Sequence, residues 1–208
     1  MQTVAPEPGG AERHHDDAAL MAAVARRDNH AFSRLYEAHR RRLYRVAYGV
    51  LLDAGEAREA VQEAFLRLHQ AAPSWEPRAQ VGTWLYRVVL NHCLVLRQLI
   101  LRLARPMLGS PAAVASPPSP ETRAVLGEAV SIVERSLASL PPKQRAAACL
   151  FLEAELPPAE IAVLLDMTPN AARVTVHRAL TCIRADLAER GIDALPTPDE
   201  TTIEPEAI

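Results

Sequence analysis

Residues 158–180, PAEIAVLLDMTPNAARVTVHRAL, decide the fold of the second half of the chain. The stretch begins with the short apolar run Ala159–Leu165 and continues after a two-residue turn into Thr168 and Pro169. Threonine is a good helix N-cap, and proline is tolerated at the first helical position because its missing amide would be unpaired there anyway. We predict a short helix, a tight turn and a longer helix that Gly191 is placed to end.

This pattern is typical of a helix-turn-helix, whose second helix can enter the major groove of DNA. Apolar residues at helical spacing give each helix an inward face; they are Ile161, Ala162, Leu165, Ala172, Val176 and Leu180. The opposite surface then holds residues that can contact base edges and phosphates. These candidates are Thr168, Asn170, Ala171, Arg173, Val174, His177 and Arg178. The alternative is an ordinary helical hairpin whose polar face contacts only water.

Composition and proline spacing predict an all-α chain of two small helical domains. Apolar residues make up 49% of the sequence and aromatic residues only 4%, a mix that favours helices over strands. Five prolines fall between residues 105 and 120, where they disfavour helix and predict an extended linker. In chain order, we therefore predict a disordered tail 1–16, a helical domain 17–104, the linker 105–120, a helix-turn-helix domain 121–191 and an acidic disordered tail 192–208.

The charge balance hides a basic middle portion. The formal net charge is −2, but residues 1–17 hold four acidic residues against one arginine, and residues 192–208 hold five acidic residues and no base. Residues 18–191 therefore carry a formal charge of +6, which fits contact with phosphates. No apolar run is long enough to span a bilayer and no signal pattern begins the sequence, so we expect a cytoplasmic protein without membrane insertion.

Several helices are expected in the first domain. Asp16 or Asp17 can cap a short helix, a second follows from about Ala31, and others cover about 54–70 and 80–103. The apolar positions predicted for the second helix are Phe32, Leu35, Tyr36, Leu43, Ala47 and Val50. In the second domain, helices are expected over about 121–139 and from Lys143, before the helix-turn-helix. The three cysteines, Cys93, Cys149 and Cys182, are far apart in helical patterns, which predicts buried free thiols rather than a disulfide or metal site.

The second domain resembles region four of the extracytoplasmic-function (ECF) group of sigma-70 family sigma factors. The resemblance rests on residues 137–145, on 160–162 and on 174–187, and implies that this domain reads the minus-35 promoter element. Asp166 stands where the family commonly has glycine, and Asp tolerates the left-handed conformation that such a turn needs. Thr175 stands where many members have a basic residue.

The segment 53–66 resembles the region-two helix with which the family docks on core RNA polymerase. An exposed polar stripe beside an apolar one suits such docking, although a solvated amphipathic helix has the same pattern. The implied polymerase-binding residues are Asp53, Glu56, Glu59, Gln62 and Glu63. Arg58 and Glu59 occupy the place of the family's acidic pair.

Residues 83–91 resemble the segment that, with the preceding loop, melts and reads the minus-10 element. The implied minus-10 contacts are Ser74, Trp75, Arg78, Arg87 and Asn91. Trp84 is instead predicted to pack in the core. After Asn91 the family's Asp is replaced by Val95, and only Arg97, Arg102 and Arg105 remain of its usual run of arginines.

The resemblance implies a sigma factor that binds core RNA polymerase and promoter DNA, recognises the minus-35 and minus-10 elements and assists promoter opening. An anti-sigma factor is a further possible partner. The alternative is a sigma-like interaction protein that sequesters an anti-sigma factor or core polymerase without opening promoters. No nucleophile, acid–base pair, metal cluster or phosphate-binding glycine loop stands out, so we expect no cofactor, no metal and no enzymatic activity.

Overall fold

The computed structural model describes residues 10–76, 80–104 and 128–192, and those residues are helical apart from short connections. The chain divides into two compact units, Met1–Ala115 (the N-terminal unit) and Ser116–Ile208 (the C-terminal unit). The predicted all-α class is confirmed for the described residues. The predicted linker 105–120 and the first residues of the helix predicted at 121–139 lie outside them.

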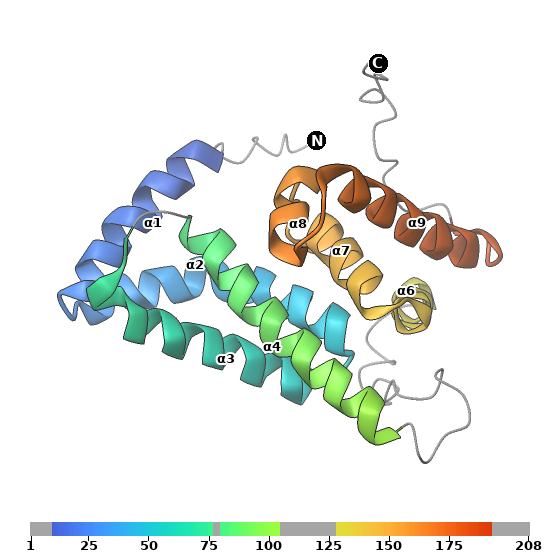
Figure 1. Cartoon of the computed structure of the whole chain (residues 1–208), viewed down its shortest axis with the longest axis horizontal. Helices are drawn as coiled ribbons and strands as arrows, with labels where there is room; N and C mark the ends of the chain where they lie inside the picture. Colours follow the sequence, from blue (N-terminus) through green and yellow to red (C-terminus); the bar gives the residue numbers. More distant parts are fainter. Residues whose placement is uncertain (1–9, 77–79, 105–127, 193–208) are drawn as a thin grey trace, which may run out of the picture. The chain divides into compact units, whose positions relative to one another are not determined.

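The N-terminal unit is built around one long helix, α2 (Figure 1). Helix α2 packs against α1, α3 and α4, and α3 and α4 also pack on each other. The bounds are α1 Gly10–Ala25, α2 Asn29–Leu51, α3 Ala54–Ala71, the 3-10 turn η1 Ala72–Ser74, and α4 Val81–Ala104. The expected second, third and fourth helices are therefore present to within two residues at their stated ends.

Aspartates set the starts of α2 and α3. The Asp28 carboxylate accepts hydrogen bonds from the amides of His30 (2.8 Å) and Ala31 (3.1 Å) at the start of α2. Leu52 follows α2 as its C-cap; it has a φ of 58°, and its amide donates to the Tyr48 carbonyl. Such caps satisfy amides and carbonyls that lack partners at helix ends, so the chain reverses direction within two residues.

The start of the chain differs from the prediction. Helix α1 begins at Gly10, so neither Asp16 nor Asp17 caps it, and residues 10–16 belong to a helix rather than to a tail. Asp17 is buried instead, and its carboxylate lies 2.8 Å from Nε2 of His39 on α2. The Asp17 carboxylate therefore has its partner on another helix, and the residues near Asp17 in the sequence do not indicate that partner.

The core of the N-terminal unit follows the predicted apolar stripe. Leu35, Leu43, Ala47 and Val50 are buried on α2. Phe32 and Tyr36, predicted for the same face, are half-buried, and their rings lie 6.1 and 4.8 Å from the ring of Phe65 on α3. Aromatic pairs at these separations stabilise the α2–α3 contact beyond the area they bury.

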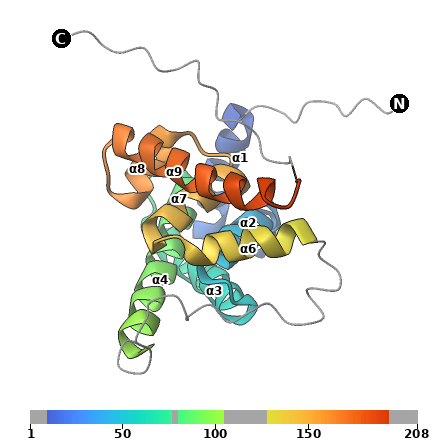
Figure 2. The ribbon, with the colours of Figure 1, turned by 90° about the vertical axis from the view of Figure 1, so that its right-hand side faces the viewer.

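In the described part of the C-terminal unit, three helices pack on a fourth. Helices α6, α7 and α8 each contact α9, and Figure 2 shows α6 lying beside α9. The bounds are α6 Glu128–Ser139, α7 Pro142–Glu153, α8 Pro158–Leu165 and α9 Pro169–Ala188. Helices α7, α8 and α9 all start with a proline, which needs no hydrogen-bond acceptor for an amide at that position.

A buried arginine links α6 and α7. Arg145 on α7 is 1% exposed, and its Nη2 donates to the carbonyls of Ala138 (2.6 Å) and Leu140 (3.2 Å). These carbonyls lie at the end of α6 and in the connection to α7, where the helix leaves acceptors without amide partners. The Ser136 hydroxyl on α6 in turn donates to the Asp186 carboxylate on α9.

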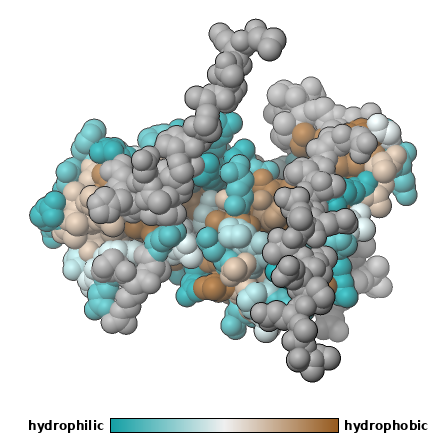
Figure 3. All heavy atoms as spheres, turned by 90° about the horizontal axis from the view of Figure 1, so that it is seen from above, coloured by the Kyte–Doolittle hydropathy of each residue, from teal (hydrophilic) through white to brown (hydrophobic). Residues whose placement is uncertain are grey.

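The visible surface is mixed in polarity. The face drawn in Figure 3 is largely hydrophilic, with hydrophobic side chains in separate small areas. Large apolar residues that are exposed include Leu66, Val95, Leu99, Val163 and Val174. Within the described residues, no helix is long and apolar enough to cross a bilayer.

Candidate functional site

The turn between α8 and α9 has the geometry that its sequence predicts. Asp166 adopts the left-handed conformation with φ 52° and ψ 65°, and its amide donates to the Ala162 carbonyl, as does the amide of Met167. The Thr168 hydroxyl accepts from the Ala171 amide at 3.2 Å, so Thr168 caps α9. Asp therefore replaces the usual glycine without loss of the turn, as expected.

The two helices present their apolar residues inward. All six predicted inward residues of this motif are buried, and α9 adds buried Ala179, Ile183 and Leu187. Lys143, at the start of α7, donates to the carbonyl of Leu165 at 3.4 Å, next to the turn. The orientation of α9 is therefore fixed by a packed interior on one side and by its capped start.

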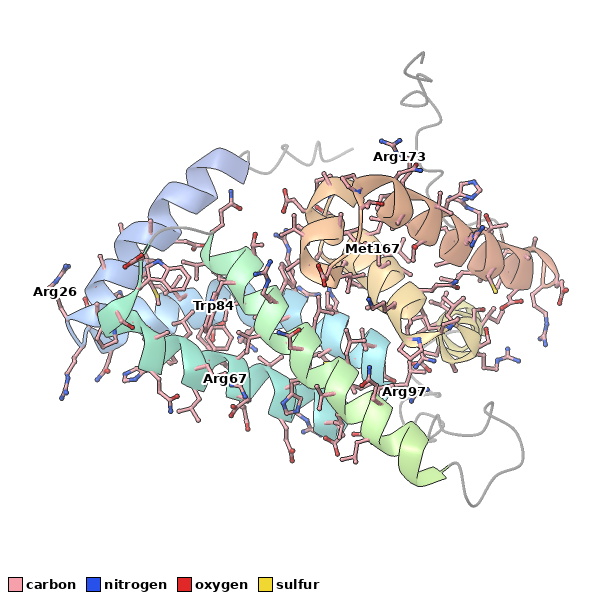
Figure 4. All side chains as sticks on the ribbon, viewed as in Figure 1. Arg26, Arg67, Trp84, Arg97, Met167 and Arg173 are labelled. Carbon is pink, nitrogen blue, oxygen red and sulfur yellow. The ribbon has the colours of Figure 1, made fainter. Side chains whose placement is uncertain are left out.

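The outward face of α9 carries the predicted DNA-contacting residues. All seven, Thr168, Asn170, Ala171, Arg173, Val174, His177 and Arg178, are exposed. Figure 4 shows Arg173 projecting away from the start of the helix. Thr175 is half-buried, and its hydroxyl donates to the Ala171 carbonyl at 2.6 Å, so it faces its own helix. The structure thus gathers these residues on one surface, and their contact with DNA stays a prediction.

Helix α3 and its N-cap residue hold the five residues predicted to bind core polymerase. The Asp53 carboxylate is the N-cap of α3, with its Oδ1 2.8 Å from the Gly55 amide and 2.9 Å from the Glu56 amide. Glu63 pairs with Arg67 at 2.7 Å. Glu59 and Gln62 are exposed, whereas Glu56 and Glu63 are half-buried. Glu59 and Gln62 are therefore the most accessible of the five, and Asp53 has a structural role as a cap.

The predicted minus-10 residues fall on two elements that one aromatic contact joins. The ring of Trp75, after η1, meets the ring of Trp84 on α4 edge to face at 5.6 Å. Ser74 is exposed, and Arg87 and Asn91 are exposed one turn apart on α4. Arg78 lies outside the described residues.

The prediction that Trp84 lies in the core is only partly correct. Trp84 is half-buried, and its ring packs edge to face against the ring of Trp75. The sequence pattern placed Trp84 with Leu85 and Val88 but could not show that a loop tryptophan would cover it. The two tryptophans therefore form one aromatic corner between η1 and α4.

The reduced basic run on α4 is further weakened by burial. Arg97 is 6% exposed, and this burial lowers the pKa of its guanidinium. Arg105 and the side chain of Arg102 lie outside the part of the chain that the structure describes. Arg97 is therefore a buried side chain and not an exposed member of the basic run, which the sequence alone did not indicate.

The cysteines lie where the sequence predicts, with one difference. Cys93 and Cys149 are buried, while Cys182 is half-buried, and all three are free thiols. Burial raises the pKa of the Cys93 thiol to about 12. The described residues contain no group of three or more His, Cys, Asp or Glu side chains that could hold a metal ion.

Sequence reasoning missed a groove between α2 and α3 that arginine and aromatic side chains line. The groove has a volume of about 550 Å³. Its lining residues are Tyr36, Glu37, Arg40, Arg41, Tyr44, Arg58, Val61 and Gln62. The sequence does show a cluster of arginines within 40–45, between the apolar positions of α2. It does not show which surface those arginines line.

A helix-turn-helix whose second helix is capped at its start and exposed along one face is typical of DNA-binding proteins. Comparisons with known proteins identify the family. The model for sigma-70 region 2 matches residues 35–96, and the model for sigma-70 region 4 matches residues 131–183. The ECF RNA polymerase sigma factor SigM of Mycobacterium tuberculosis is 36% identical over 143 residues, which cover 68% of this chain and 70% of SigM.

Other similarities extend over more of the chain. The ECF RNA polymerase sigma factor SigW of Bacillus subtilis is 25% identical over 177 residues, covering 80% of this chain and 94% of SigW. The fold is similar to that of a solved structure of CnrH in complex with the cytosolic domain of CnrY, with a TM-score of 0.63 at 21% identity over 86% of this chain and 99% of that chain. The chain belongs to the ECF RNA polymerase sigma factors.

Proposed function

We propose that the chain directs core RNA polymerase to promoters and assists their opening. In this proposal the exposed face of α9 reads the minus-35 duplex, with Asn170 and Arg173 toward base edges and Arg178 toward a phosphate. The observation that carries it is the set of seven candidate residues on one exposed surface of a helix whose start is capped and whose opposite side is packed. A recognition helix needs this division between an anchored and an accessible side.

The N-terminal unit is proposed to bind polymerase through α3 and single-stranded minus-10 DNA through the aromatic corner and α4. Glu59 and Gln62 are exposed on α3 and can form polar contacts with a protein partner. Arg87 and Asn91 are exposed on α4, and Trp75 lies at its start beside Trp84, where a base could stack. An anti-sigma factor remains a predicted partner.

Promoter opening in this proposal is driven by binding and involves no catalysis by this chain. Contacts to unstacked minus-10 bases stabilise the open duplex, and the polymerase performs the phosphodiester chemistry. Sigma factors are initiation factors rather than enzymes in themselves. We propose that the protein acts in the cytoplasm, where it would meet polymerase and promoter.

Reconstitution with core polymerase tests the proposal. The full chain is mixed with polymerase lacking its own sigma subunit, and strand opening is followed by permanganate reactivity of unpaired thymines on a promoter from the source genome. We expect core binding and chain-dependent opening. Core binding without opening on any such promoter would instead support the sequestering alternative, and absence of core binding would refute the polymerase assignment.

A further inference from the structure

The groove between α2 and α3 contains arginine and tyrosine side chains that take no part in the contacts proposed above for α3. Three arginines, Arg40, Arg41 and Arg58, line it together with a single glutamate, Glu37. Arg41 and Arg58 are exposed, one on each helix. Guanidinium groups on opposite walls of a groove can bind a carboxylate through paired N–H donors.

The aromatic walls of the groove are held in place by the packing behind them. The ring of Tyr36 lies 4.8 Å from that of Phe65, and the ring of Tyr44 stacks on that of Tyr48 at 6.1 Å. Arg40 lies over Tyr36, 5.8 Å from the ring centre, and its Nε donates to Glu37 at 2.8 Å. Because these groups already have fixed partners, the groove needs little rearrangement to accept a ligand.

Arg58 connects the groove to the proposed polymerase surface. Its Nε donates to the Ala54 carbonyl at 2.9 Å, one turn back on α3. Gln62, one turn further on, lines the groove and is also one of the two accessible polymerase-binding candidates. Arg58 stands at the position where the family usually has one of an acidic pair, so the groove is more basic here than the family pattern implies.

We infer that this groove, defined by Arg40, Arg41, Arg58, Tyr36 and Tyr44, takes an acidic side chain from the core polymerase surface that docks against α3. The inference rests on the proposed function, and it names a contact that the acidic and amide residues of α3 cannot make. Two features favour a carboxylate on that same partner: the excess of arginine over glutamate, and the continuity of the groove with Gln62.

The test is a charge reversal of the two exposed arginines, Arg41→Glu with Arg58→Glu, in the full chain. Binding of the fluorescently labelled chain to sigma-free core polymerase is measured at several salt concentrations. We expect binding to weaken about tenfold or more, and the salt dependence of the remaining binding to flatten, because a charge pair has become a repulsion. The double lysine variant, Arg41→Lys with Arg58→Lys, should recover part of the affinity because it keeps the charge without the planar fork.

A matched control reverses two exposed arginines outside the groove. Arg26 and Arg27 follow α1, and Figure 4 shows Arg26 pointing away from the helices. Arg26→Glu with Arg27→Glu makes the same change in net charge and should leave core binding within about twofold, since charges outside an interface contribute little at moderate salt. Far-UV circular dichroism melts of all variants check that each is folded.

The outcomes separate this inference from the proposed function. If the parent chain binds core polymerase and the groove variant binds equally well, the inference is wrong while the proposed function stands. If the groove variant loses affinity for single-stranded or duplex promoter DNA but not for polymerase, the groove takes phosphates, and the inference is again wrong. If the parent chain does not bind polymerase, both are refuted.

Discussion

Replacing Arg145 with methionine should selectively destabilise the C-terminal unit. The substitution keeps an unbranched side chain of similar length but removes the guanidinium, which donates to the Ala138 and Leu140 carbonyls from a position that is 1% exposed. Both acceptors are then left without this donor near the α6–α7 connection. Helices α6 and α7 both pack against α9. Loss of these two hydrogen bonds should therefore also weaken the packing that holds α9.

The magnitude follows from the two hydrogen bonds. A hydrogen bond to a charged group contributes about 1.5–3 kcal/mol, and a buried acceptor without a partner costs about as much. Methionine restores some apolar packing, so we expect the free energy of unfolding of the C-terminal unit to fall by about 3–5 kcal/mol. This is a large share of the roughly 5–15 kcal/mol that stabilises a typical folded domain.

The distribution of aromatic residues lets one experiment separate the two units. Both tryptophans, Trp75 and Trp84, lie in the N-terminal unit, so tryptophan fluorescence reports its unfolding, whereas far-UV circular dichroism reports helices of both. In urea, we expect the dichroism transition of Arg145→Met to move to lower urea while the fluorescence transition stays in place. Arg135→Met, an exposed change on α6, should move neither by more than about 0.5 kcal/mol.

Two results would refute this reasoning. If Arg145→Met unfolds at the parent's midpoint by dichroism, the two hydrogen bonds do not stabilise the unit as inferred. If fluorescence and dichroism shift together by the same amount, the two units do not unfold separately, and the effect cannot be assigned to the C-terminal unit.

Three further predictions address the cap, the recognition face and a buried thiol. Thr168→Ala should destabilise the C-terminal unit by about 1 kcal/mol in dichroism melts, with Thr168→Ser close to the parent, because only serine retains an oxygen that accepts from the Ala171 amide. Arg173→Ala should weaken promoter-duplex binding by about 1–3 kcal/mol in fluorescence anisotropy and leave core binding unchanged; equal promoter affinity in mutant and parent would contradict its place on the reading face. Burial raises the pKa of the Cys93 thiol from 9.0 to about 12, so the folded state holds this proton more tightly, and the resulting stability is full below pH 9.0 and is lost as pH rises toward about 12. Cys93→Ala should therefore reduce the loss of N-terminal-unit stability between about pH 8 and about pH 10, measured by urea titration of tryptophan fluorescence, and an unchanged loss would contradict this.

Much of the candidate site could be predicted because its signals are local. Threonine followed by proline marks the start of α9, and Asp166 suits a left-handed turn, so neither feature depends on distant residues. The four-residue spacing of Ala172, Val176 and Leu180 fixes which side of α9 is buried and hence which side is exposed. Similar reasoning located the start of α2 and both ends of α3 and α4 within two residues.

The errors fall where a residue's role depends on a partner far along the chain. Asp17 looked like a helix cap but pairs with His39, which is 22 residues away. Trp84 looked like a core residue but is half-buried against Trp75 from a loop. Arg97 looked like part of a basic surface, and burial removes it from that surface. In each case the side chain suits either role chemically, and only its tertiary neighbours distinguish the two.

The sequence by itself therefore determined most of the helices, the cap of α9 and the accessible face of α9, because hydrogen bonding within a helix and its apolar periodicity act over a few residues. Only the tertiary structure decided that Arg145 is a buried link between α6 and α7 and that arginines from α2 and α3 line one groove. Burial and the meeting of charges from separate helices are set by how the helices pack, and that information is spread over the whole chain.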